Sequence, residues 1–246
     1  MRLFLSSAAL LLVAGCGPGP ALYAAAPLTP DTVVDGDARE WPAALRPVPG
    51  EAGLSLGLRR DADALVLAVI AGDERQARRI ALGGLQVWID PAGGTDEVLG
   101  LRFPSPGPLD PADLRRQQRG ATAADADQLR RRFENGTQEV EVTRGVVTQR
   151  ASPGGRFGGL EAAATWTDRG LVVEMRLPLT ATPGLLTEAA RGSLGIGIEL
   201  LDLRRAPVGG GATRGRRPPA SDGAETPREP AAVGVGTVTR WVRIDP

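Results

Sequence analysis

The sequence contains no histidine and no lysine, and its only cysteine is Cys16. All 29 basic residues are therefore arginines. These absences exclude a Ser-His-Asp triad, a histidine general base, a Schiff-base lysine and zinc or haem sites with histidine ligands. A single cysteine also excludes a disulfide within the chain and a thiolate metal cluster. Any catalysis would have to use carboxylates.

Net charge and aromatic content are low as well. The 29 arginines are balanced by 29 acidic residues, which argues against nucleic acid as a partner because nucleic-acid binders normally carry a basic excess. Aromatic residues make up only 4% of the chain, so few side chains are available for stacking on a ligand. With 42% hydrophobic residues, the chain can still bury a core.

The N-terminus has the pattern of an export signal. Arg2 precedes an apolar run over residues 3–13, which is shorter than the roughly 20 residues that span a bilayer. The stretch Val13-Ala14-Gly15-Cys16 resembles the lipobox of bacterial lipoproteins, which implies a signal peptide over residues 1–15 and a lipid on Cys16. We expect an exported protein anchored to the inner or outer membrane of the cell envelope. The alternative is an ordinary signal peptide followed by an unused thiol.

Residues 16–30 are rich in glycine, proline and alanine, which predicts a tether, and the folded domain is expected over residues 31–246. Short runs with period-two alternation dominate the domain, and strands do not alternate regularly with helices. This pattern predicts an all-β fold, an antiparallel β-sandwich of about ten strands. The expected strands cover residues 54–58, 64–71, 85–90, 97–103, 138–143, 160–166, 171–177, 194–200 and 233–244.

Two segments depart from the strand pattern. Residues 110–134 read as a helical insertion, with Pro111 suited to a first turn and with Leu129 and Phe133 on one face. Residues 206–231 have almost no apolar periodicity and predict a long mobile loop.

Several stretches resemble family 9 carbohydrate-binding modules. Val34-Asp35-Gly36-Asp37, followed by Glu40-Trp41-Pro42, is similar to the opening motif of that family. Similarity continues, in the same order along the chain, through residues 58–73 (LRRDADALVLAVIAGD), 85–91 (LQVWIDP) and 171–179 (LVVEMRLPL). The resemblance implies a non-catalytic β-sandwich that binds sugars through aromatic side chains and often holds a structural calcium.

Trp88 is the best candidate for a sugar platform. Alternation places it on one face with Gln86 and Asp90, opposite Leu85 and Val87 on the core side. A flat aromatic ring stacks on a pyranose, and the neighbouring polar groups can bond its hydroxyls. The alternative is that Trp88 packs beneath the helical insertion.

The other tryptophans have different expected roles. Trp241 is a second ligand candidate whose exposure the alternation leaves open, because the apolar residues around it fall on both faces. Trp41 and Trp166 are expected to pack in the core, with Trp41 plugging the sandwich.

Metal and catalytic candidates are all carboxylates. Asp61, Asp63 and Asp73 stand in turns, where calcium finds oxygen ligands, but their spacing does not match an EF-hand loop. A plain surface role is the alternative for each. A glycosidase would need two carboxylates held about 5 to 9.5 Å apart, and neither Asp35 nor Asp37 is a persuasive member of such a pair.

The sequence therefore predicts a lipid-anchored envelope protein whose β-sandwich binds a polysaccharide or oligosaccharide without catalysing a reaction. The second hypothesis is a structural or interaction component that binds another envelope protein. The third is a carboxylate-dependent glycoside hydrolase.

Overall fold

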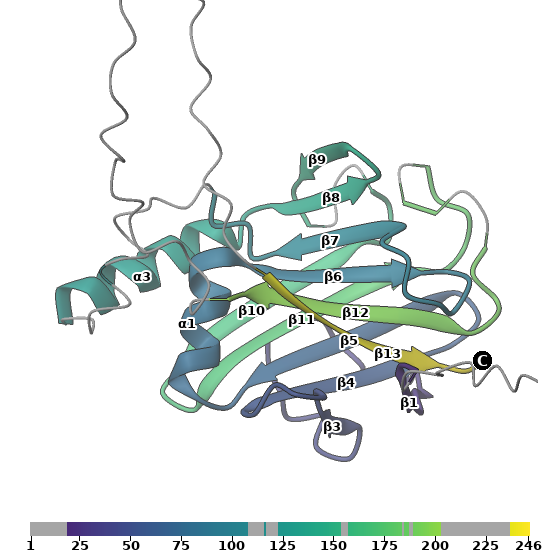
Figure 1. Cartoon of the computed structure of the whole chain (residues 1–246), viewed down its shortest axis with the longest axis horizontal. Coiled ribbons are helices and arrows are strands. Elements are labelled where there is room, and N and C mark those ends of the chain that lie inside the picture. The colour runs from purple at the N-terminus through teal and green to yellow at the C-terminus, as the bar shows by residue number, and fades with distance from the viewer. Residues whose placement is uncertain are drawn as a thin grey trace, which may run out of the picture.

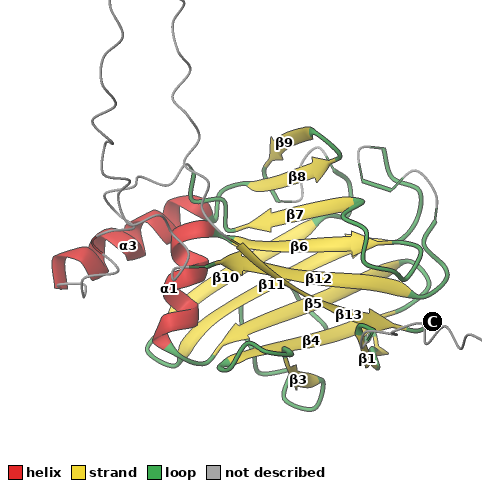
Figure 2. Cartoon of the chain, viewed as in Figure 1, coloured by secondary structure: helices red, strands yellow, loops and turns green. Residues whose placement is uncertain are grey.

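The computed structural model describes residues 19–107, 116, 123–153, 157–183, 185–186, 189–202 and 237–246. These residues form two β-sheets packed face to face, with helices α1 (Glu74–Gly83) and α3 (Ala123–Gly136) at one end (Figure 1). Strands account for most of the regular structure, as the colouring in Figure 2 shows. The antiparallel β-sandwich predicted from the sequence is confirmed, with thirteen strands in the described part of the chain.

The larger sheet has seven strands in the order β1-β13-β12-β6-β7-β8-β9. Every neighbouring pair is antiparallel except β1 and β13, which run parallel along one edge. Its strands are β1 (Ala21–Tyr23), β6 (Leu85–Asp90), β7 (Leu99–Phe103), β8 (Val140–Arg144), β9 (Val147–Ala151), β12 (Leu194–Leu201) and β13 (Thr237–Ile244).

The smaller sheet has six strands in the order β10-β11-β5-β4-β2, with β3 also paired to β4. The β2–β4 pair is parallel and the others are antiparallel. Its strands are β2 (Ala26–Pro27), β3 (Leu45–Pro47), β4 (Leu54–Arg60), β5 (Ala64–Ala71), β10 (Glu161–Thr167) and β11 (Gly170–Pro178).

Strand β5 is apolar on both faces, and the fold uses both. Leu65 and Leu67 face the main core between the sheets, whereas Val66 and Ala68 face outward. The outward residues form a second cluster with Trp41, which is fully buried. Trp41 is therefore a core residue as predicted, but it seals the outer face of the six-stranded sheet instead of plugging the sandwich.

The two helices cover one end of the sandwich. Helix α1 begins after Asp73, whose side chain accepts a hydrogen bond from the Gln76 amide, the usual N-cap arrangement. Helix α3 lies within the predicted helical insertion, and its Leu129 and Phe133 are both buried, as their i, i+4 spacing predicts. Part of residues 110–134 lies outside the described residues. Sequence reasoning missed α1 altogether.

The predicted tether needs a correction. Residues 16–30 were expected to precede the fold, yet β1 and β2 lie within them and pair with β13 and β4. Strands β3 and β9 were also missed, while the other nine strands match predicted ranges. The expected loop over residues 206–231 and the predicted signal peptide with Cys16 fall outside the described residues. No helix among the described residues has the length and apolar character needed to cross a bilayer.

Candidate functional site

Two tryptophans and two glycines form a row across the outer face of the seven-stranded sheet. Trp241 on β13 pairs in register with Gly197 on β12, which pairs with Trp88 on β6, which pairs with Gly100 on β7. Residues in register share a face, and the core residues of β6 point the other way. Trp88 and Trp241 are both half-buried, which answers the question that alternation left open for Trp241. We call this row the aromatic strip.

The glycines leave room for both indoles to extend over the neighbouring strand. A Cβ at Gly197 would stand 3.0 to 3.1 Å from Cε2, Cζ2 and Cη2 of Trp241, so it would press on the face of that ring. A Cβ at Gly100 would stand 2.4 Å from Gln86 Nε2 and 2.6 and 2.9 Å from Cζ3 and Cε3 of Trp88. The Trp241 ring therefore occupies the space of a side chain at Gly197, and the Trp88 ring shares the space at Gly100 with the Gln86 amide.

Each ring extends from its own strand over the next strand of the sheet. Trp241 extends from β13 over Gly197 on β12, and Trp88 extends from β6 over Gly100 on β7. Both rings are thus displaced in the same direction across the sheet, and they remain two strands apart. Two strand spacings correspond to about 9.6 Å between ring positions.

Glu199 fixes the orientation of Trp88. The Trp88 Nε1–H donates to Glu199 Oε2 at 2.5 Å, a charge-assisted hydrogen bond from β6 to β12. Sequence reasoning missed Glu199 and both glycines of the strip. The available signal was the stretch 194–199, in which glycine alternates with apolar residues and the outward set ends in this glutamate.

A row of polar residues lies beside the aromatic strip on the same outer face, displaced by two residues on each strand. Its members in register are Glu199, Gln86, Arg102, Glu141 and Arg150. Glu141 accepts from Arg150 Nη2 at 2.6 Å, and its other oxygen lies 3.6 Å from Arg102 Nη1. The side chains of Arg102 and Arg150 are 41% and 51% exposed; Arg102 lies on β7 beside the Trp88 ring, whereas Arg150 lies on the edge strand β9.

Gln86 and Asp90 share this face but lie beneath its surface. Gln86 is 5% exposed; its Oε1 accepts from Arg102, and its Nε2 has no hydrogen-bond partner among the described residues. Asp90 is 2% exposed, and its carboxylate accepts from the amides of Ala92 and Asp96 in the following turn. The expectation that both residues contact a ligand does not fit this burial, because alternation gives the face of a residue and not its depth.

The predicted calcium candidates do not come together. Asp61 closes the β4–β5 turn by accepting from the amides of Asp63 and Ala64, and Asp73 caps α1. These turns lie at opposite ends of β5, about 25 Å apart for eight residues of strand. One calcium ion needs six to eight oxygens within about 2.6 Å, so these carboxylates do not fit a shared site.

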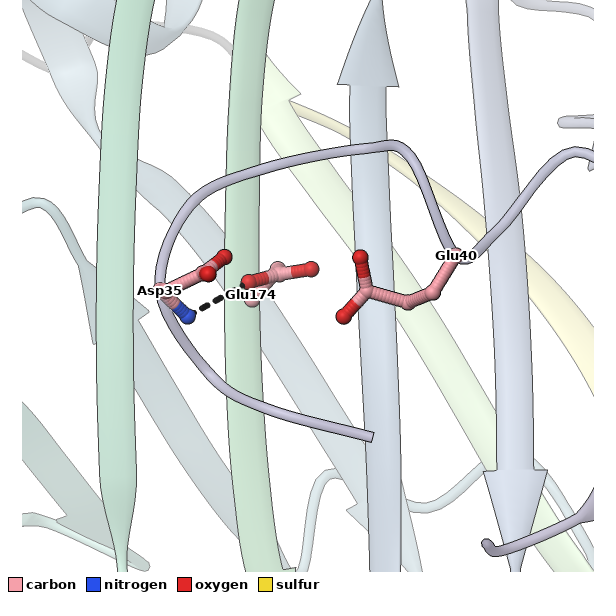
Figure 3. A group of neighbouring side chains, drawn as sticks. All are labelled: Asp35, Glu40 and Glu174. Carbon is pink, nitrogen blue, oxygen red and sulfur yellow. Dashed lines mark hydrogen bonds between the residues drawn. The ribbon is translucent and has the colours of Figure 1, made fainter. Parts of the chain in front are cut away.

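Another group of carboxylates does converge. Asp35, Glu40 and Glu174 bring one oxygen each within 4.8 Å of the others, on the outer face of the six-stranded sheet (Figure 3). Glu174 is fully buried and is already engaged by three donors. Its Oε2 accepts from the amides of Asp35 and Gly36, and its Oε1 accepts from Trp41 Nε1 at 2.5 Å.

Glu174 therefore holds the segment around Asp35 and Trp41 onto the sheet. Burial raises the pKa of the Glu174 carboxyl, although its three hydrogen bonds act in the opposite direction. A carboxyl with 0% exposure cannot touch a substrate, so a raised pKa here does not make it a general acid. Because Glu174 binds the amides of Asp35 and Gly36 and the indole N–H of Trp41, the Asp-Gly pair and this tryptophan act together in holding the segment. Glu174 lies within residues 171–179, but the sequence pattern did not mark it as a functional residue.

A cavity of about 450 Å³ lies between α1, α3 and the β10–β11 turn, and Trp166 lines it. The Arg130 guanidinium lies 5.2 Å from the centroid of the Trp166 ring, and Phe133 packs against the same ring at 5.7 Å in an edge-to-face arrangement. Trp166 is half-buried and packs against the core, close to the role expected for it. Its ring is occupied by its own neighbours, in contrast to the rings of the aromatic strip.

Comparison with known proteins gives only distant similarity. No family model matches the sequence, and no curated protein matches it. Among solved structures, the chain is similar to a family 9 carbohydrate-binding module from Caldicellulosiruptor kristjanssonii in complex with cellotriose, with a TM-score of 0.39, 9% identity and 92% of each chain covered. The same module in complex with glucose gives a TM-score of 0.39 and 11% identity, covering 92% of this chain and 94% of that one.

Proposed function

We propose that this chain is a lipid-anchored protein of the bacterial cell envelope that binds a glycan on the aromatic strip and does not catalyse a reaction. The observation that carries the proposal is the pair of indoles lying over Gly197 and Gly100 on an outer sheet face. Trp88 and Trp241 stay partly exposed on the sheet surface, so part of each ring is not used for the protein's own packing. Such rings are suited to the flat apolar face of a pyranose.

The spacing of the rings favours an extended chain over a single sugar. In an extended β-1,4-linked chain, alternate sugars present the same face, and the two-sugar repeat is close to two strand spacings, about 9.6 Å. A chain lying across β12, β6 and β7 can therefore place every second sugar on an indole. Arg102 on β7 stands beside this path and can donate to sugar hydroxyls or to acidic substituents.

Several observations support a non-catalytic function. The sequence has no histidine or lysine, so a general acid and base would both have to be carboxylates. Glu141 beside the strip is held by Arg150, and Glu199 is held by Trp88. The acidic group around Glu174 lies on the other sheet, and Glu174 itself is inaccessible. These contacts do not favour the third hypothesis, a glycoside hydrolase.

A binding panel tests the glycan proposal. The full chain and its Trp88→Ala and Trp241→Ala variants are titrated by calorimetry against β-1,4-linked glucan, xylan and N-acetylglucosamine oligosaccharides and against α-linked glucans. We expect binding to a β-1,4-linked chain, with each substitution weakening it about tenfold to a hundredfold, since a buried aromatic contact contributes roughly 1.5 to 3 kcal/mol. Trp166→Ala is the matched control and leaves the affinity unchanged. No binding to any glycan, or release of a product from one, contradicts the proposal.

The anchor is tested separately. Cells expressing the full chain are labelled with a radioactive or alkynyl fatty acid, and the protein is followed by gel and mass spectrometry. We expect the label on the native chain and none on Cys16→Ser, because the only thiol of the chain is the acceptor. A label that persists in Cys16→Ser, or a native chain without lipid, refutes the anchor. Fractionation of the envelope then assigns the inner or outer membrane.

One observation favours the second hypothesis, a protein partner in the envelope. The β8–β9 hairpin exposes Val146 completely and Val147 by 52%, at the edge of the seven-stranded sheet remote from β1. Exposed sheet edges can pair with a strand of another chain. Cross-linking in cells from position 146 would yield a defined adduct under this hypothesis, and the glycan panel would then show no binding.

A further inference from the structure

The N-terminal segment is fixed to both sheets. Strand β1 pairs in parallel with β13, and the Tyr23 hydroxyl donates to the Pro47 carbonyl. Ala21, Tyr23 and Ala25 pack against the main core, and β2 then pairs with β4 in the opposite sheet. The chain is therefore held in place from Ala21 onward and does not behave as a free tether in this stretch.

The remaining tether is short. Five residue steps separate Cys16 from Ala21, and a fully extended chain spans at most about 3.6 Å per residue, or about 18 Å in all. A lipid on Cys16 would therefore keep β1 within about 18 Å of the headgroups, whatever conformation the intervening residues adopt. This distance is smaller than the breadth of the seven-stranded sheet, whose six strand spacings amount to about 29 Å.

The surface at β1 has the composition of an interfacial site. Leu22 is 66% exposed and pairs in register with Arg243 on the outer face. The Tyr23 hydroxyl donates to the carbonyl of Pro47, so Arg46, the preceding residue on β3, also lies near this edge. Arg46 bonds only backbone carbonyls among the described residues, so no carboxylate there neutralises it. An apolar side chain, a tyrosine and a cation together suit the boundary between headgroups and water.

We propose that this β1 edge, defined by Leu22, Tyr23 and Arg46, is a lipid-facing surface that rests on the bilayer holding the anchor. The inference depends on the lipid anchor of the proposed function and not on glycan binding. It also places the aromatic strip near the bilayer. Trp241 lies one strand from β1, about 5 Å, and Trp88 lies three strands from β1, about 14 Å. A glycan on the strip is therefore bound at the membrane surface and not at a distance from it.

The test uses the lipidated full chain in vesicles of phosphatidylethanolamine and phosphatidylglycerol. Leu22→Cys places a fluorescent label at the β1 edge, and Val146→Cys places the same label on the fully exposed tip of the β8–β9 hairpin. The lipid blocks the Cys16 thiol, so only the introduced cysteine reacts. Headgroup-spin-labelled lipid then quenches each label according to its distance from the bilayer. We expect several-fold stronger quenching at position 22 than at position 146.

A linker insertion provides the internal control. A long Gly-Ser linker placed after Gly17 frees the domain, and quenching at position 22 should fall to the level at position 146. Equal quenching at the two positions without the insertion overturns the lipid-facing surface. A Cys16 without lipid by mass spectrometry overturns the anchor and this inference with it. Strong quenching at position 22 together with no binding in the glycan panel supports the inference and refutes only the glycan function.

Discussion

The two outer faces of the sandwich carry a tryptophan in the same local setting, and only one of the two tryptophans is open to solvent. On the six-stranded sheet, Trp41 lies over Gly57, where a Cβ would meet Cε3 at 2.5 Å, and its indole N–H donates to Glu174. On the seven-stranded sheet, Trp88 lies over Gly100 and donates to a glutamate in the same way. A glycine below the ring and a carboxylate at its edge orient both indoles.

The difference lies in what covers them. On the six-stranded sheet, Leu28, Val34 and Ala44 from the stretch before β3 pack against the outer cluster of Trp41, Val66 and Ala68, and Trp41 is fully buried. Among the described residues, no comparable segment crosses the aromatic strip, and Trp88 remains half-buried. The same local arrangement therefore stabilises the fold on one face and presents an aromatic surface on the other.

The largest expected effect separates the two tryptophans by stability. Trp41→Ala removes a fully buried indole and should lower the free energy of unfolding by about 4 kcal/mol, within the usual range for Trp-to-Ala changes in cores. Trp88→Ala should cost about 1 kcal/mol, because its ring is already partly in water. Urea unfolding followed by circular dichroism measures both. If both substitutions lowered the free energy of unfolding equally, Trp41 and Trp88 would be equally buried in solution.

An intermediate effect is expected at the glutamate beneath the covered face. The Glu174 carboxylate accepts hydrogen bonds from three N–H groups on its two oxygens. In Glu174→Gln, the amide NH₂ would face at least one of these donors, which should lower the free energy of unfolding by about 2 kcal/mol. Burial raises the pKa of Glu174 in the folded state, so the folded protein binds this proton more tightly than the unfolded chain does. The stability of the native protein should therefore fall as pH rises from the ordinary carboxyl range through that raised pKa.

Urea unfolding across this pH range, compared between the native chain and Glu174→Gln, isolates the contribution of this one group. The variant should lack the fall in stability, and the exposed Glu161→Gln on β10 serves as the control that retains it. A native chain whose stability rises over the same pH window would show that the hydrogen bonds to Glu174 outweigh its burial.

The smallest expected effect changes affinity and leaves the fold intact. Gly197→Val puts a side chain against the face of Trp241, so the ring must lift from the sheet, and glycan affinity should fall about tenfold, or about 1.4 kcal/mol. Gly57→Val, the equivalent change beneath Trp41, should reduce stability and leave affinity unchanged. Gly192→Ala, where an added Cβ meets nothing within 4 Å, is the neutral control. Unchanged glycan affinity in Gly197→Val would show that the position of the Trp241 ring over Gly197 is not needed for binding.

Much of the sandwich was predictable because strand alternation reports which side chains share a face. The apolar run 64–71 became the central strand β5, and Leu129 and Phe133 became a buried helical pair. Trp88 was correctly placed on the outer face for the same reason. Helix α1 was missed because its residues include three arginines, so the helical face that packs on the sandwich gave only a weak apolar signal.

The contacts that define the site were beyond sequence reasoning. Glu174 and Trp41 are separated by 133 residues and meet only because the segment before β3 folds over the outer face of the six-stranded sheet, to which β11 belongs. Gln86 and Asp90 alternate with core residues exactly as ligand-facing groups would, yet both are buried. Depth depends on which neighbouring side chains cover a residue, and those neighbours lie on other strands.

The sequence by itself determined the fold class, the faces of residues in the regularly alternating strands and the restricted chemistry of a chain without histidine or lysine. Only the tertiary structure decided that Gly197 and Gly100 lie under the rings of Trp241 and Trp88. It also decided that residues 21–27 belong to the two sheets and not to a tether. The physical reason is the same in each case: alternation is a local property of one strand, whereas strand register and covering segments depend on pairings between residues far apart in the chain.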